Sequence, residues 1–341
     1  MKLSIIAPIY NAAAFMESMV RSVQAQEADD WELILVDDGS TDGSGELCDA
    51  LAAADARIRV IHQPNSGAAA ARNAGLAAAG GAYIGFIDSD DAAKPGMFRK
   101  LLSSAELHRS DIVMGGYEKV HDDAHRDAVH IPFPEEVTGS HAIRKIAWSM
   151  AFWNGYWEGK QMPSVYGSVW PNLYRADFLR RYEIGFPAGV RIGEDLLFNL
   201  DAFRHAERVS VVDEPLYAYN VANASATRKQ NRELWERYTQ LLRLEAEKLT
   251  LQYGPSEELT YNLHRQAVNY AINVGEEQLC VFRRGREARR AIRALCGDEQ
   301  LQTAAAYIAK HGRSLKERMQ AILIKGRFAG LIQLWLTKSQ P

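Results

Sequence analysis

The first 90 residues alternate between two hydrophobic periods, and this alternation limits the possible folds more than any other feature of the chain. Short apolar runs typical of buried strands are separated by segments whose apolar residues recur every three or four positions, as on one face of a helix. Strands that alternate with helices usually pair in parallel, because each helix carries the chain back across the sheet. We therefore expect an α/β fold with a mostly parallel sheet flanked by helices on both faces. The expected strands are LSIIAPI, WELILV, IRVIHQ and AYIGFID.

The pattern changes twice further along the chain. Residues 92–220 are less regular, and within them VSVVDEPLYAYN predicts a strand, a turn and a second strand. Beyond this part only the helical period remains. We therefore expect an α/β domain over residues 1–225 and an α-helical C-terminal region over residues 226–341.

Charge and cysteine content exclude several classes of protein. The 341-residue chain has a net charge of −3 and no recognisable nucleic-acid-binding module, so we expect no nucleic acid partner. Cys48, Cys280 and Cys296 are too few and too scattered for a disulfide framework or a zinc site, which favours inert thiols in a reducing compartment. The N-terminus does not resemble a secretory signal, and no run reaches the roughly 18 apolar residues of a membrane span. The expected location is cytoplasmic, or peripheral on the inner face of the plasma membrane.

Polar side chains follow the first two expected strands. Asp38 comes after the apolar run LILV and Asp37, and Tyr10 follows the first strand. Ligands of open α/β sheets bind at the carboxyl ends of the strands, where a carboxylate can accept hydrogen bonds from a base or ribose and a tyrosine can offer its ring face. The alternative is a simple strand end, with Ser40 or Thr41 capping the next helix. No G-x-G-x-x-G follows the first strand, which argues against a dinucleotide-dependent oxidoreductase.

The segment NSGAAAARNAG, residues 65–75, predicts a turn followed by a helix start. Free N–H groups at a helix N-terminus favour an anion, and Arg72 in the second turn could reach a phosphate or a base oxygen. The alternative is a surface arginine on an alanine-rich helix.

The segment FIDSDD ends another expected strand in the three acids Asp88, Asp90 and Asp91. Clustered carboxylates repel one another unless a cation lies among them. Mg²⁺ and Mn²⁺ prefer such oxygen ligands and usually bind one or two carboxylates together with substrate phosphates. The pattern therefore predicts a metal–diphosphate site, against the alternative of a capped turn.

The stretches PIYN, VDDGSTD and ARNAG…DSDD, in this order, resemble the family 2 glycosyltransferases with the GT-A fold, a Rossmann-like architecture. The resemblance covers residues 1–110 and resumes over residues 165–198. This family transfers a sugar from a nucleotide diphosphate with inversion at the anomeric carbon. The resemblance implies a donor-binding half over 1–110 and an acceptor-binding half over 111–225. It implies donor contacts at Pro8, Tyr10, Asp38, Arg72, Asp88 and Ser89, metal binding at Asp90, and an acceptor-orienting or metal-supporting role for Asp91.

The motif GEDLLF supplies a candidate general base. Glu194 and Asp195 precede an apolar helical run, and acids at that place also simply favour a helix N-terminus. Inverting transfer needs a carboxylate that takes the proton of the acceptor hydroxyl. The resemblance implies that Asp195 is this base, with Glu194 as second choice. Trp170 and Asn172 in VWPNLY are candidates for lining the acceptor pocket, although Trp is also a common core residue.

The resemblance has informative departures. The Gln-x-x-Arg-Trp motif of processive members is absent, so we expect a single sugar addition. The expected reaction moves one sugar from a nucleotide-diphosphate sugar, with UDP favoured, to a glycan or lipid-linked acceptor in surface polysaccharide synthesis, using Mn²⁺ or Mg²⁺. Two rivals remain. A sugar nucleotidyltransferase typically begins with a glycine-rich phosphate loop, which APIYNAAAF lacks, and a catalytically silent GT-A-like binding module would keep the fold without turnover.

The C-terminal region is basic and amphipathic. Residues 282–293 contain six arginines and one acid, and residues 313–338 mix Arg and Lys with large apolar side chains. Such helices can lie in a membrane interface beside anionic lipids, so residues 282–338 predict a peripheral membrane contact. The alternative is that the apolar stripes pack on the catalytic domain or on a second subunit, which would give a homodimer.

Overall fold

The computed structural model describes residues 2–26, 30–122, 124–221, 233–281 and 285–339. It divides into two compact units, Met1–Trp153 with Pro163–Ala224, and Asn154–Met162 with Ser225–Pro341. The expected boundary at residue 225 lies outside the described residues, so the predicted domain limits stay a prediction. No sequence pattern predicted that the short segment 154–162 belongs with the C-terminal helices.

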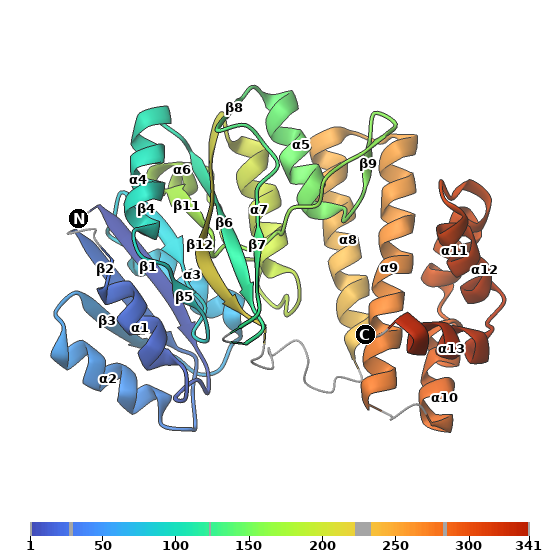
Figure 1. The fold of residues 1–341 in the computed structure, drawn as a ribbon, viewed down its shortest axis with the longest axis horizontal. Helices are drawn as coiled ribbons and strands as arrows, with labels where there is room; N and C mark the ends of the chain where they lie inside the picture. Colours follow the sequence, from blue (N-terminus) through green and yellow to red (C-terminus); the bar gives the residue numbers. More distant parts are fainter. Residues whose placement is uncertain (1, 27–29, 123, 222–232, 282–284, 340–341) are drawn as a thin grey trace. The chain divides into compact units, whose positions relative to one another are not determined.

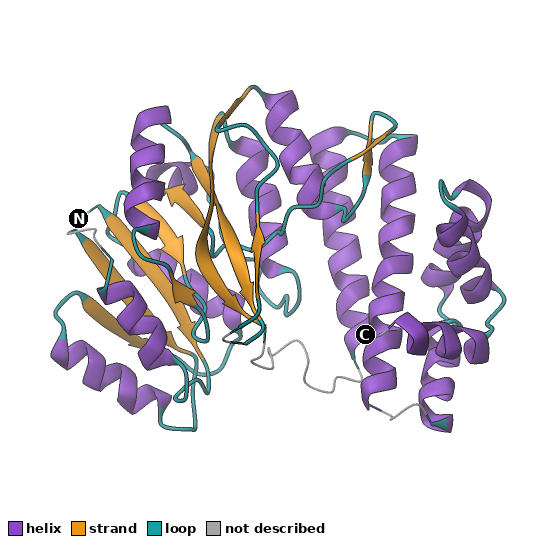
Figure 2. Cartoon of the chain, viewed as in Figure 1, coloured by secondary structure: helices purple, strands orange, loops and turns teal. Residues whose placement is uncertain are grey.

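The first unit is an α/β layer structure around one mixed sheet (Figures 1 and 2). The sheet strands are β1 (Leu3–Ile9), β2 (Trp31–Asp37), β3 (Ile58–His62), β4 (Tyr83–Phe86), β5 (Ala92–Ala93), β6 (Ile112–Val120), β7 (Arg126–Val129), β8 (Glu136–Thr138), β11 (Asn172–Arg175) and β12 (Arg208–Asn220). The helices are α1 (Met16–Gln24), α2 (Ser44–Ala54), α3 (Ala68–Ala78), α4 (Met97–His108), α5 (Ser140–Ala151), α6 (Ala176–Arg181) and α7 (Glu194–His205).

The strand order is β3-β2-β1-β4-β11-β6-β12-β5, with β7 beside β6 and β8 beside β12. Strands β3, β2, β1 and β4 are parallel, β11 runs antiparallel to both β4 and β6, and β12 is parallel to β6. The expected parallel arrangement is confirmed for β1 to β4, whereas the sheet as a whole is mixed. The carboxyl ends of β1, β2 and β4 therefore meet at one edge, which positions the site described below.

One predicted feature of the sheet is wrong. The expected strand, turn and strand of VSVVDEPLYAYN form the single strand β12, whose pairing with β6 shifts register on either side of Pro215. Proline has no N–H to donate, so the ladder is interrupted locally and then resumes instead of turning back.

The core of the first unit explains why the alternating pattern folds in this way. Strands β1 and β2 are buried on both faces, with Ile5, Ile6 and Leu33 fully buried. Burial of such a side chain stabilises the fold by roughly 1.5–3 kcal/mol. Helix α3 packs directly on β1 because Gly75 has no side chain: a Cβ there would lie 2.4 Å from Cγ2 of Ile6.

The second unit is helical apart from one short hairpin. Its elements are β9 (Tyr156–Trp157), β10 (Lys160–Gln161), α8 (Leu234–Tyr253), α9 (Glu257–Val281), α10 (Arg286–Leu295), α11 (Glu299–His311), α12 (Leu315–Lys325) and α13 (Ala329–Ser339). The amide side chain of Asn262 on α9 holds the hairpin through the N–H and C=O of Tyr156. Among the described residues, no helix is both long and apolar enough to cross a membrane. Cys48 and Cys296 are buried thiols, and the side chain of Cys280 lies outside the described part.

Candidate active site

The sheet edge gathers the predicted donor residues. The N–H of Asp38 donates to the carbonyl of Ile9 (2.8 Å), so the loops after β1 and β2 lie side by side. The ladder between β1 and β4 ends one residue before Asp88. Tyr10 is half exposed and directly follows β1, and Pro8 is half-buried and pairs with Val36 of β2.

The loop after β2 is fixed by its own carboxylates. Asp38 is buried, and its two oxygens accept hydrogen bonds from the amide side chain of Gln63 (2.6 Å) and the N–H groups of Ser66 (2.9 Å) and Gly67 (2.8 Å). The N–H groups of Ser66 and Gly67, directly before α3, are thus occupied by Asp38, which shapes this turn. Helix α3 itself begins at Ala68 without a side-chain cap, so anion binding by its first turn stays a prediction.

The capping alternative for this loop is also wrong. Helix α2 begins at Ser44 after Gly43 in a left-handed conformation, and neither Ser40 nor Thr41 caps it. Instead Ser40 and Thr41 link the loop after β2 to Asn11 in the loop after β1. These contacts fix the backbone beside Tyr10.

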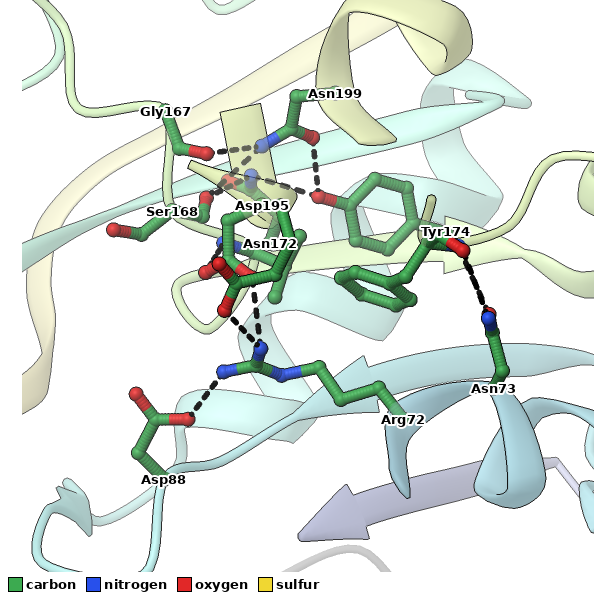
Figure 3. Close-up of polar contacts among 12 residues, drawn as sticks. Arg72, Asn73, Asp88, Gly167, Ser168, Asn172, Tyr174, Asp195 and Asn199 are labelled. Carbon is green, nitrogen blue, oxygen red and sulfur yellow. Dashed lines mark hydrogen bonds and ion pairs between the residues drawn. The ribbon is translucent and has the colours of Figure 1, made fainter. Parts of the chain in front are cut away.

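Arg72 joins three distant segments (Figure 3). Its guanidinium is buried and lies 2.9 Å from a carboxylate oxygen of Asp88, 3.0 Å from Glu194 and 3.0 Å from Asp195. The alternative of a solvated surface arginine is wrong. Burial alone would lower the pKa of Arg72, but the three carboxylates outweigh it and raise that pKa, so the guanidinium stays charged. Arg72 thus ties the GEDLLF motif to the end of β4.

The acids around Arg72 outnumber the positive charge. Three carboxylates face one guanidinium, so full ionisation would leave two negative charges in a largely buried place. Burial is the main cause that raises the pKa of Asp195 to about 7; Arg72 opposes the rise, and Glu194 and Asp88 add to it. The second oxygen of Asp195 accepts from the N–H of Val169 (3.3 Å). A carboxylate with this pKa can take and release a proton near neutral pH.

The DSDD loop after β4 divides into two parts. Asp88, Ser89 and Asp90 are half-buried, whereas Asp91 is buried and accepts from the hydroxyl of Tyr217 (2.7 Å) and the N–H of Asn220 (2.8 Å). Asp91 therefore anchors the loop to β12, and its role toward the acceptor or the metal stays a prediction.

Asp90, the predicted metal ligand, is half-buried two residues after Asp88. Burial and the neighbouring charge of Asp88 raise its pKa, a tension that a bound cation would relieve. Within the described part of the chain, no group of three or more His, Cys, Asp or Glu side chains could hold a metal ion. One or two carboxylates together with donor phosphates are the usual Mg²⁺ arrangement, and Asp90 with Asp88 fits that donor set.

Trp170 and Asn172, which were predicted with Asp91 to contact the acceptor, are both buried. Trp170 is buried, and its ring stacks on Tyr217 with centroids 4.4 Å apart. Asn172 is buried as well and donates to the carbonyl of Ser168 and the hydroxyl of Tyr174. Both residues support the loop that carries Val169, the hydrogen-bond donor to Asp195, rather than line a pocket.

Sequence reasoning missed the residues that hold the site together. Asn199 on α7 accepts from Tyr174 (2.6 Å) and donates to the carbonyl of Gly167 (2.8 Å), as Figure 3 shows. Asn73 exchanges two hydrogen bonds with the backbone of Phe186, whose ring lies 5.4 Å from the Arg72 guanidinium. Only their positions in the sequence could have indicated these two residues, because Asn73 directly follows Arg72 and Asn199 directly follows the GEDLLF motif.

The sequence of this chain matches a known family of enzymes. Residues 4–179, more than half of the chain, match the family described as glycosyl transferase family 2. The chain belongs to this family. It is 39% identical over 226 residues to the uncharacterized glycosyltransferase EpsJ of Bacillus subtilis, a match that covers 63% of this chain and 60% of EpsJ. It is 31% identical over 237 residues to the putative glycosyltransferase EpsH of the same organism, covering 68% and 64%.

The fold is also similar to solved structures of TarS. TarS 1–349 of S. aureus superposes with a TM-score of 0.66 at 20% identity and covers 100% of this chain and 92% of that chain. A second structure of the same TarS fragment, in complex with UDP-GlcNAc, has a TM-score of 0.64 at 19% identity and covers 99% and 91%. At this identity the likeness shows the GT-A fold. The matched part spans less than two thirds of EpsJ and EpsH.

Proposed function

We propose that this chain is a metal-dependent, inverting glycosyltransferase that moves one sugar from a nucleotide-diphosphate sugar to a glycan or lipid-linked acceptor. The observation that carries the proposal is the Arg72 cluster. The guanidinium of Arg72 contacts both Asp88, which follows strand β4, and Asp195, the candidate base. A nucleotidyltransferase needs no such base, and a silent binding module has no use for buried, mutually repelling acids.

The proposed reaction follows from these residues. The acceptor hydroxyl oxygen attacks the anomeric carbon from the face opposite the diphosphate, the bond from that carbon to the diphosphate oxygen breaks, and Asp195 takes the hydroxyl proton. Arg72 orients Asp195 and opposes the rise of its pKa, and Asp88 supplies a second carboxylate that fixes the guanidinium. A divalent cation held by Asp90 and the donor phosphates would neutralise the charge of the departing diphosphate.

UDP is the favoured nucleotide. The support is the family resemblance together with the similar fold of TarS, whose structures include a complex with UDP-GlcNAc. A polysaccharide acceptor is in keeping with another relative, the putative teichuronic acid biosynthesis glycosyltransferase TuaG of Bacillus subtilis, 37% identical over 142 residues.

The test of this function measures donor binding and transfer separately. Calorimetry with UDP and UDP-sugars, with and without Mn²⁺, should show metal-dependent binding that Asp90→Ala removes. Asp91→Asn serves as the matched control, because Asp91 is bonded to Tyr217 and Asn220. Undiminished binding or transfer by Asp90→Ala would contradict the metal site, and synthesis of a nucleotide-sugar from a sugar phosphate would establish the rival activity.

We also propose that the second unit binds an anionic membrane surface through α12 and α13. Half of the large hydrophobic side chains that the described residues expose lie within 20 residues of this unit. These six side chains are at least 50% exposed: Leu315, Met319, Ile322, Phe328, Leu331 and Leu334. Those of α12 recur at helical spacing and form one stripe. A concentration of this kind on a folded unit marks a contact surface.

Charge selects the partner of that surface. Lys316, Arg318 and Lys325 on α12 are exposed, so their positive ends can reach headgroups while the apolar stripe enters the interface. The one acid of α12, Glu317, is turned away and is bound by Tyr261 (2.6 Å) and Arg265 (2.9 Å). Basic residues beside an anionic membrane each contribute about 1 kcal/mol.

Helix α10 behaves differently from α12 and α13. It exposes its arginines but buries Ala288 and Ile292 in the helical core. This arrangement agrees with the alternative prediction, in which the basic face is solvated and the apolar side chains pack within the protein. Residues 282–284 of the predicted basic run lie outside the described residues.

Sedimentation with lipid vesicles tests the membrane surface. The protein should bind phosphatidylglycerol vesicles at least tenfold more strongly than phosphatidylcholine vesicles, and Met319→Ser with Leu331→Ser should abolish the difference. Leu107→Ser is the control, because Leu107 is exposed on α4 of the other unit. An equal loss of vesicle binding in the Leu107→Ser control would contradict the proposal. So would a dimer of the intact protein that the double variant dissociates, and this second result would favour the homodimer instead.

A further inference from the structure

A cavity lies in the first unit and is lined by none of the catalytic acids. Its volume is about 230 Å³. Its walls include Arg109, Arg175, Tyr182, Arg181, His205 and Arg208. None of these residues takes part in the site around Arg72.

Sheet topology places this cavity at the opposite edge of the sheet. Arg208 begins β12, and Asp111, which also lines the cavity, immediately precedes β6. Both β4 and β6 are antiparallel to β11, so β4 and β6 run in the same direction. The amino end of β6 therefore lies at the edge opposite the carboxyl end of β4, where Asp88 stands.

The positive charge of the cavity exceeds its negative charge. Asp111 is neutralised within the fold: it pairs with Arg175 (2.9 Å) and accepts from the N–H groups of Glu207 (2.8 Å) and Arg208 (3.1 Å). Within the described part of the chain, the side chains of Arg109, Arg181 and Arg208 form no ion pair. Three further arginines thus line the cavity beside one acid, Glu207, and all four side chains are exposed. The local charge is positive in a protein whose net charge is negative.

One wall of the cavity is aromatic and ordered. The rings of Tyr182 and His205 stack with centroids 4.4 Å apart and an interplanar angle of 16°. Tyr182 follows α6 and His205 ends α7, so this stack joins the C-terminal ends of the two helices. Arg181, the last residue of α6, lies directly before the stacked Tyr182.

We propose that this cavity is a second binding site, for a small molecule that carries a phosphate or diphosphate group. Guanidinium groups match phosphate oxygens in both charge and geometry. The volume is below the roughly 300–1,000 Å³ of pockets for drug-sized ligands, which suits a small phosphate ester or a diphosphate. The site is independent of the proposed transferase function, because it shares no residue with the catalytic acids.

Isothermal titration calorimetry of the full chain with inorganic diphosphate in metal-free buffer tests this site. The catalytic edge does not compete under these conditions, because its carboxylates repel diphosphate when no cation is bound. The intact protein should bind diphosphate, and Arg181→Gln and Arg208→Gln should each weaken the binding at least fivefold.

Arg204→Gln is the matched control for surface charge. Arg204 precedes His205 on α7 but does not line the cavity, so its loss should change diphosphate affinity less than twofold. Absence of binding to the intact protein, or equal weakening by all three substitutions, would overturn the proposal. A circular dichroism spectrum of each variant distinguishes loss of the ligand site from loss of the fold.

Discussion

Two acidic loops stand at one edge of the same sheet, one after β2 and one after β4, and they hold their carboxylates in opposite ways. In the first loop, burial alone would raise the pKa of Asp37, but hydrogen bonds from Ser40 and His62 outweigh it and hold that pKa below its ordinary value. Asp38 is likewise surrounded by donors. In the second loop, burial and Asp88 raise the pKa of both Asp90 and Asp91.

We interpret the difference as that between a structural loop after β2 and the proposed reactive loop after β4. Negative charge after β2 is satisfied by the fold, so it stabilises the native state. Negative charge after β4, and around Arg72, is left in excess, which is a feature of sites that bind cations or transfer protons. Similar local sequences, VDDGS and DSDD, therefore serve different purposes.

The largest expected effect lies on the reactive side. Asp195→Asn should lower the transfer rate by about 10²–10⁴, the usual contribution of a general base, while donor affinity stays within about twofold. Since the base must be ionised and its pKa is raised to about 7, the rate of the intact enzyme should rise with pH up to about 7 and then level off. Rate measurements from pH 5 to 9 check both statements.

Glu194→Gln is the control for Asp195→Asn, because it also removes one carboxylate from Arg72. It should keep most of the transfer rate. A collapse of donor affinity in Asp195→Asn would assign Asp195 to the donor site instead.

A second, intermediate effect compares the same substitution in the two loops. Asp38→Asn replaces one accepting oxygen by an N–H₂ group and leaves buried donors without a partner, so it should lower the free energy of unfolding by about 2 kcal/mol. Asp90→Asn removes a charge that the metal-free fold disfavours, so the free energy of unfolding should stay the same or rise. Urea unfolding at pH 7 without metal measures both, and equal losses would remove the distinction between the loops.

Part of this contrast was predictable from the sequence, because it rests on local pattern. Strand and helix periods over residues 1–90 predicted the parallel strands, and the positions of Asp38 and Asp88 after apolar runs predicted their common edge. The family pattern also named Asp195. These features depend on neighbours in the chain, which the sequence displays directly.

The remainder depends on partners that are distant in the chain. Arg72 lies 16 residues from Asp88 and 122 residues from Glu194, and no local pattern announces that one guanidinium joins them. For the same reason the donors that enclose Asp38 were missed, and Trp170 was expected to line a pocket although its ring is buried against Tyr217. Composition indicates that a residue is polar or aromatic, but tertiary packing decides whether it faces a ligand.

The smallest expected effect is a difference in pH dependence between the loops. Burial and Asp88 raise the pKa of Asp91 to about 8, above its value of about 3.9 in an unfolded chain. Its contribution to stability is therefore fully present below pH 4 and is lost as pH rises toward 8, by at most about 1.4 kcal/mol per pH unit. Asp37 has a lowered pKa, so its contribution is present at neutral pH and is lost only in acid.

Thermal unfolding of Asp91→Asn and Asp37→Asn from pH 3 to 9 in metal-free buffer separates these signs. Asp91→Asn loses a hydrogen bond at every pH, so its melting temperature should be lower over the whole pH range. The variant should also lack the fall in stability between pH 5 and 8. Asp37→Asn should keep that fall and flatten the acid side of the curve. Parallel curves for the two variants and the intact protein would mean that both loops hold their charge in the same way, and the reactive character assigned to the loop after β4 would lose its physical basis.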